Sequence, residues 1–157
     1  MQSPIRQLLD VVALSVALAF ASSALAANEF NVDDDGAALK GYDPVAYFED
    51  GSATPGSAEY TIAVDGVTYH FASAAHRDAF SADPDKYRPQ FGGYCAMGTA
   101  MGKKFDVDPE AFRVVDGKLY MNLSKKVQVK WLEDVPGNIV KANNNWPKIK
   151  DKSPEEL

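Results

Sequence analysis

Alternating apolar and polar residues mark two β-hairpins in this chain of 157 residues. In the stretch "YTIAVDGVTYHFAS" the apolar residues alternate on both sides of Asp65-Gly66, a pair typical of a two-residue hairpin turn. A second pair, Asp116-Gly117, joins "FRVV" to "KLYMNL" in the same way. We therefore expect two antiparallel hairpins of the same form.

A helical pattern follows each hairpin. Ser73 is a typical N-cap before a helix over residues 74–82. After the second hairpin, the apolar spacing of residues 124–134 and the run 137–144 behind Pro136 predict further helices. Together these elements predict one α+β domain, in which small antiparallel hairpins pack against a few short helices.

The first 26 residues have the pattern of a secretory signal peptide. Arg6 precedes an apolar run over residues 11–20, and the small residues Ala24 and Ala26 stand where a signal peptidase would read them. The apolar run is too short to cross a membrane, and no second run follows it. We therefore expect an exported protein, periplasmic or secreted, with no membrane span.

Composition divides the remainder of the chain into three parts. Residues 27–39 are acidic and polar and predict a loose leader, residues 40–147 form the folded domain with a C-terminal helical extension, and residues 148–157 predict a charged, frayed tail. The net charge of −6 argues against nucleic acid as a partner.

Several spaced motifs between residues 40 and 90 resemble the YHS domain, a small module found in heavy-metal transport proteins. The motifs are "GYDPV" at 41–45, Gly66, "YHFAS" at 69–73, Phe80 and "DPDKY" at 83–87. The later stretches "GGYCAMG" and "FRVVDGKLYMNL" and the segment from Trp131 to Trp146 are similar to longer exported members. The resemblance is specific for the fold and less so for an activity.

This chain departs from the metal-binding members of the wider group at the positions of their ligands. Those members carry three cysteines in motifs that look like "DPVCGM" and "YFCSxxC". The matching positions here are Ala46, Ala72 and His76. Because an alanine methyl group cannot ligate a metal, the cysteine site of the family cannot be carried over, and only His76 remains as a ligand from that set.

Other soft ligands lie around the single cysteine of the chain. Thiolate and thioether sulfur prefer Cu(I), and imidazole accepts copper or zinc, whereas structural zinc requires four ligands. We therefore expect a copper ion, with Cu(I) favoured and zinc less so. Each candidate also has a structural interpretation: a core cysteine, apolar methionines or solvated histidines. The candidate metal ligands are Cys95, Met97, Met101, His76 and His70.

These observations predict an exported metal-binding protein that binds, buffers or delivers copper, with Cys95 as the principal ligand. Its partners would be the metal ion and another exported metal-handling protein. As a ligand, Cys95 would be reachable, with a pKa below the roughly 8.5 of a free thiol.

Two other interpretations of the chain stay open. One is a thiol redox protein, or a homodimer linked through Cys95, because an odd cysteine in an exported protein suggests an intermolecular bridge or a reactive thiol. The other is a metal-free protein-interaction domain. No residue is assigned a catalytic role, and an enzyme is the less favoured class because no catalytic motif has the required spacing.

Overall fold

A computed structural model describes residues 28–157, so the predicted signal peptide lies outside the described residues. Within this range, six helices and two antiparallel two-stranded sheets form a single domain, which confirms the predicted α+β fold. The elements are α2 (Ala46–Glu49), β1 (Ser57–Val64), β2 (Val67–Phe71), α3 (Ala74–Ala82), α4 (Pro84–Tyr87), α5 (Ala96–Ala100), β3 (Asp108–Val115), β4 (Lys118–Asn122), α6 (Lys125–Leu132) and α7 (Val135–Ile149), with short 3-10 helices η1 (Leu39–Gly41), η2 (Phe91–Gly93) and η3 (Pro154–Glu156).

Both predicted hairpins are present. The turn residues Asp65 and Gly66 have φ of 53° and 78°, and Asp116 and Gly117 have φ of 49° and 72°. Positive φ at both central positions is the geometry of a type I′ turn, whose twist matches that of the flanking strands. The Asp-Gly pairs therefore set the register of β1 with β2 and of β3 with β4.

The two hairpins belong to a repeated structural unit. Each strand pairing of the second hairpin lies 51 residues after a pairing of the first, and the same irregularity interrupts both. Helix caps repeat as well, because Ser73 caps α3 as Ser124 caps α6. We call residues 38–87 the first unit and residues 90–149 the second unit.

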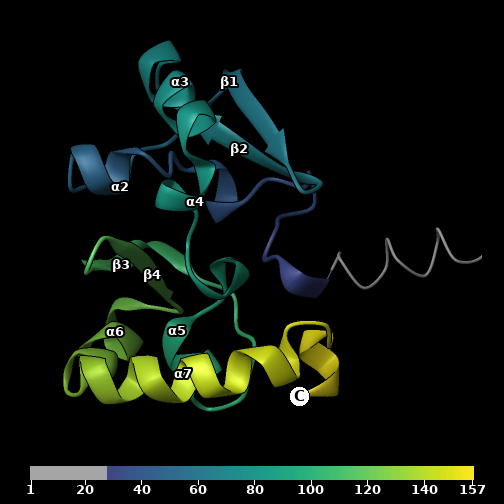
Figure 1. The fold of residues 1–157 in the computed structure, drawn as a ribbon, viewed down its shortest axis with the longest axis vertical. Coiled ribbons are helices and arrows are strands. Elements are labelled where there is room, and N and C mark those ends of the chain that lie inside the picture. The colour runs from purple at the N-terminus through teal and green to yellow at the C-terminus, as the bar shows by residue number, and fades with distance from the viewer. Residues whose placement is uncertain (1–27) are drawn as a thin grey trace, which may run out of the picture.

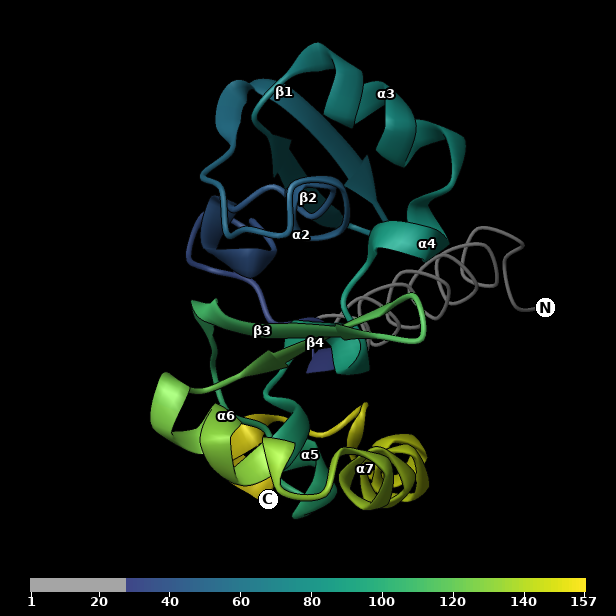
Figure 2. The ribbon, with the colours of Figure 1, turned by 90° about the vertical axis from the view of Figure 1, so that its left-hand side faces the viewer.

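The units lie one after the other along the long axis of the molecule. The β1–β2 hairpin and α3 form one end, the β3–β4 hairpin lies in the middle, and α5, α6 and α7 form the other end (Figures 1 and 2). Helix α7 covers α5 and also contacts α6. No helix within residues 28–157 is long and apolar enough to cross a membrane.

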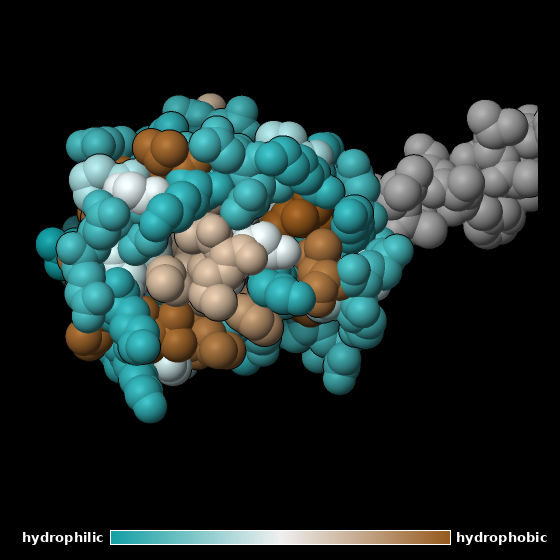
Figure 3. Space-filling model, turned by 90° about the horizontal axis from the view of Figure 1, so that it is seen from below, coloured by the Kyte–Doolittle hydropathy of each residue, from teal (hydrophilic) through white to brown (hydrophobic). Residues whose placement is uncertain are grey.

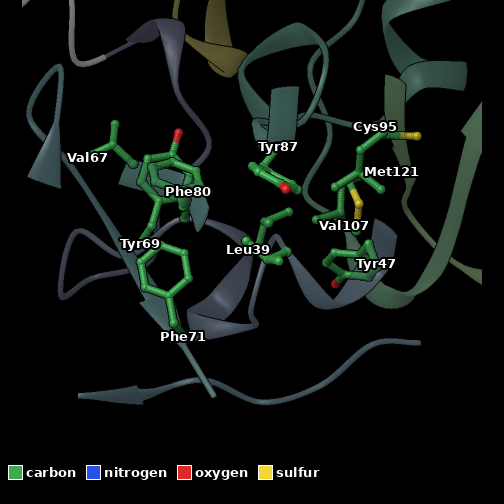
Figure 4. Close-up of a cluster of buried hydrophobic side chains, with 13 residues drawn as sticks. Leu39, Tyr47, Val67, Tyr69, Phe71, Phe80, Tyr87, Cys95, Val107 and Met121 are labelled. Atoms are coloured by element: carbon green, nitrogen blue, oxygen red, sulfur yellow. The ribbon is translucent and has the colours of Figure 1, made fainter. Parts of the chain in front are cut away.

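The larger hydrophobic cluster draws on both units and joins them. Figure 4 shows Tyr69, Phe71 and Phe80 toward one side of this cluster and Cys95 and Met121 toward the other. A second cluster, which includes Tyr120, Trp131 and Ala142, is confined to the second unit. Because the larger cluster is shared, neither unit has a complete core of its own.

The segment expected to be a loose leader, residues 27–39, is packed in its described part. Asn31 N–H donates to Gly92 O at 2.8 Å, and Ala37, Ala38 and Leu39 are buried. The acidic composition of this segment predicts exposure to solvent. Its last apolar residues instead pack beside β2, where Ala38 N–H donates to Thr68 O.

The tail expected to fray, residues 148–157, is also held. The ammonium group of Lys104 is buried and lies 2.6 Å from each of three backbone oxygens, those of Asn28, Lys150 and Lys152. A buried charge needs such hydrogen bonds, and these bonds tie both ends of the described chain to the loop after α5. The predicted final helix is also longer than residues 137–144, because α7 continues to Ile149.

A substitution at the first hairpin turn tests its assigned role. Gly66 has φ of +78°, and no atom of the surrounding chain lies within 4 Å of the place that a Cβ would take, so a larger residue there meets backbone strain and no clash. We expect Gly66→Val to lower the free energy of unfolding by more than about 1 kcal/mol. Gly66→Asn is the control, because asparagine tolerates positive φ and should lose less. Equal stability of the valine variant and the parent in denaturant titrations would contradict this.

Candidate functional site

The carboxylate of Asp43 is fully buried just before α2. Its Oδ1 accepts hydrogen bonds from Val45 N–H at 2.8 Å and Ala46 N–H at 3.3 Å, and its Oδ2 accepts from Ala72 N–H at 2.9 Å. Backbone donors of this kind stabilise an ionised carboxylate away from water. Asp43 therefore links the start of α2 to the end of β2.

His76 is the fourth partner of this carboxylate. Ser73 caps α3 by accepting from His76 N–H at 3.2 Å, so His76 lies in the first turn of α3. The His76 Nδ1 lies 2.6 Å from Asp43 Oδ2, and the imidazole is 20% exposed. In the neutral tautomer that donates Nδ1–H to the carboxylate, the lone pair is on Nε2. This nitrogen lies 4.0 Å from an oxygen of the half-exposed Asp50.

Cys95 occupies the place in the second unit that Asp43 occupies in the first. Its Sγ accepts from Gly98 N–H at 3.4 Å, three residues along, and from Leu123 N–H at 3.3 Å, immediately before the serine that caps α6. Asp43 bonds the corresponding N–H groups of its own unit. The thiol is thus a helix cap that joins the start of α5 to the end of β4.

The second unit does not reproduce the histidine. Val127 stands where His76 stands, since its N–H donates to the capping Ser124. Cys95 has no exposed surface, and its Sγ lies 3.8 Å from Asn122 Oδ1. Burial raises the pKa of the Cys95 thiol, although nearby backbone N–H groups oppose the shift. This direction is opposite to the one expected for a reachable ligand thiolate.

The other candidate ligands lie in different parts of the structure. Met97 is half-buried and packs against both hydrophobic clusters, whereas Met101, at the end of α5, is 64% exposed. His70 lies on β2 of the first unit, where it pairs with Thr61. Within residues 28–157, no group of three or more His, Cys, Asp and Glu side chains is arranged to hold a metal ion.

Two residues beside His76 are not among the ligands that the sequence predicts. Asp43 belongs to the "GYDPV" motif without an assigned role, and Asp50 belongs to no motif. An Asp-Pro pair is a local sign of a turn in which the carboxylate accepts from the backbone N–H groups that follow, so the sequence does contain a signal for this local role of Asp43. Its contact with His76 spans 33 residues and has no local sign.

The Asp43 carboxylate should contribute strongly to stability. Asp43→Asn replaces an acceptor oxygen by an NH₂ group and leaves buried N–H donors without a partner. We expect a loss of roughly 2–4 kcal/mol in the free energy of unfolding. His76→Gln is the control and should lose less, because the backbone donors keep their acceptor. Denaturant unfolding of both variants measures the difference, and a smaller loss for Asp43→Asn than for His76→Gln would contradict the assignment.

Cys95 should react with an alkylating reagent only when the protein opens. Burial removes access to the thiol, and its raised pKa lowers the thiolate fraction near neutral pH. We expect labelling of the native protein, followed by intact mass, to be slower than labelling in denaturant by at least about a hundredfold. Rapid native labelling at neutral pH would show that the thiol is accessible and would restore it as a candidate ligand.

Comparison with known proteins returned no match: no family model, no curated protein and no solved structure matches this chain. The YHS resemblance therefore stays a prediction from the motifs of residues 40–90. The case for a function rests on the geometry of Asp43, His76 and Asp50.

Proposed function

We propose that this protein is an exported metal-binding module that handles copper, with His76 as its anchoring ligand. The observation that carries the proposal is the 2.6 Å contact between Asp43 Oδ2 and His76 Nδ1, which leaves Nε2 as the free nitrogen of a partly exposed ring. Histidines that ligate metals usually donate their other ring N–H to a carboxylate or carbonyl, which orients the ring and raises its basicity. Asp43 would orient the His76 ring in this way.

The available donors favour Cu(II) over Cu(I) at this position. An imidazole nitrogen and the carboxylate of Asp50 are nitrogen and oxygen donors, which suit Cu(II), and Cu(II) binds such donors more tightly than zinc does. The sequence favoured Cu(I) because of Cys95, but the burial of that thiol moves the proposal to His76. Water or a partner protein would complete the coordination, so the ion would be exchangeable.

The charge around His76 also supports a cation. The first unit, residues 38–87, carries eight acidic and three basic side chains, whereas residues 90–157 carry nine acidic and eleven basic ones. His76 therefore belongs to the strongly acidic part of the molecule. A negative field raises the local concentration of cations and their rate of association.

A copper titration with matched variants tests this proposal. We expect the mature protein to bind one Cu(II) ion, and His76→Gln to weaken binding at least about tenfold while glutamine keeps a donor for Asp43. Asp50→Asn should have a smaller effect. His70→Gln and Cys95→Ser are the controls and should bind as the parent does.

Competition with a chromophoric chelator measures these affinities. Equal affinity of His76→Gln and the parent would refute the assignment to His76. A loss of binding in Cys95→Ser with the fold intact would return the site to the thiol.

A further inference from the structure

The end of the molecule formed by α5, α6 and α7 exposes large apolar side chains. Val129 of α6 is 62% exposed and Val140 of α7 is 59% exposed. Leu132 is 42% exposed, and Met101 directly after α5 is 64% exposed. Figure 3 views the molecule from this end and shows apolar residues gathered in the middle of the face with hydrophilic residues around them. We call this surface the α6–α7 face.

Lysines accompany these apolar side chains. Five lysines on α6 and α7 are exposed, and residues 125–149 hold only two acidic residues, Glu133 and Asp134. The Asp134 carboxylate caps α7 by accepting from Gly137 N–H at 3.0 Å. The face is thus positively charged as well as apolar. The lysines are Lys125, Lys126, Lys130, Lys141 and Lys148.

The charge of the molecule is divided along its long axis. The first unit, residues 38–87, has a net charge of −5, from eight acidic and three basic residues, and residues 90–157 have +2, from eleven basic and nine acidic residues. The β1–β2 hairpin and α3 lie at the end opposite the α6–α7 face (Figure 1). A negatively charged surface would therefore attract one end of the molecule and repel the other.

We propose that the α6–α7 face docks on an anionic lipid surface. Lysines beside a membrane are attracted by its acidic headgroups, and neighbouring aliphatic side chains can enter the boundary between headgroups and acyl chains. Val129, Leu132 and Val140 are exposed aliphatic residues, which a fluid lipid boundary accepts without a shaped pocket.

A second copy of the chain fits this face less well. Its acidic surface lies on the first unit, so charge would favour a head-to-tail contact between copies. Such a contact does not close a dimer and would continue into a ring or a filament. A lipid surface can bind this face without any contact between copies of the chain. It also leaves the His76 side of the molecule turned toward solvent, and the docking proposal stands independently of metal binding.

Vesicle cosedimentation of the mature protein tests the proposal. The probes are vesicles of phosphatidylcholine alone and vesicles of phosphatidylcholine with phosphatidylglycerol. We expect binding only to the anionic vesicles, and a loss of that binding when salt rises to about 0.5 M, where charges on the surface are screened within about 4–5 Å. Absence of binding to the anionic vesicles at low salt would overturn the proposal.

Paired variants identify the face. Lys130→Gln/Lys141→Gln should weaken binding at least about tenfold, and Val129→Ser/Val140→Ser about threefold or more, with thermal midpoints close to the parent's. Lys40→Gln/Lys86→Gln removes two lysines from the first unit and should leave binding unchanged. Equal losses in this control would overturn the proposal. Unchanged vesicle binding in the valine variant, together with binding of the parent to soluble polyglutamate, would assign the face to an acidic macromolecule and also overturn it.

Discussion

The buried carboxylate of Asp43 is the interaction on which the candidate site depends. It is in contact with three backbone N–H groups and with His76, and these partners come from α2, from the end of β2 and from α3. A buried charge is tolerable only when its hydrogen bonds are complete, so the four partners are held in one arrangement. The imidazole is consequently fixed by the same contact that stabilises the fold.

The second unit meets the same structural requirement with different chemistry. Cys95 receives the equivalent N–H groups, but a thiol can be buried as a neutral group, so it needs no cationic or imidazole partner. Val127 takes the place of the histidine and packs against the larger hydrophobic cluster. The first unit thus has the partly exposed imidazole of His76 at this position, whereas the second unit has the apolar side chain of Val127. The lone cysteine of the chain therefore has a structural explanation.

Packing and charge give the two ends of the molecule different characters. The second unit has its own cluster around Trp131, closed by α7, and the first unit has no helix of comparable length. Helices α6 and α7 bring lysines and aliphatic residues to one end, and the acidic residues of the first unit lie toward the other. The same repeated hairpin and helix therefore carry a cation-attracting surface at one end and a basic, apolar surface at the other.

Local signals in the sequence determined the hairpins and the helix starts, because an Asp-Gly turn requires positive φ at its own residues and a serine cap bonds a backbone N–H three residues away. The burial of Cys95 and the contact between Asp43 and His76 arise when segments about 30 residues apart meet. Lys104 likewise reaches backbone oxygens 46 to 76 residues away, which carry no side-chain signal. Only the tertiary structure decided these features, because burial and pKa depend on neighbours that alternation and capping patterns do not specify.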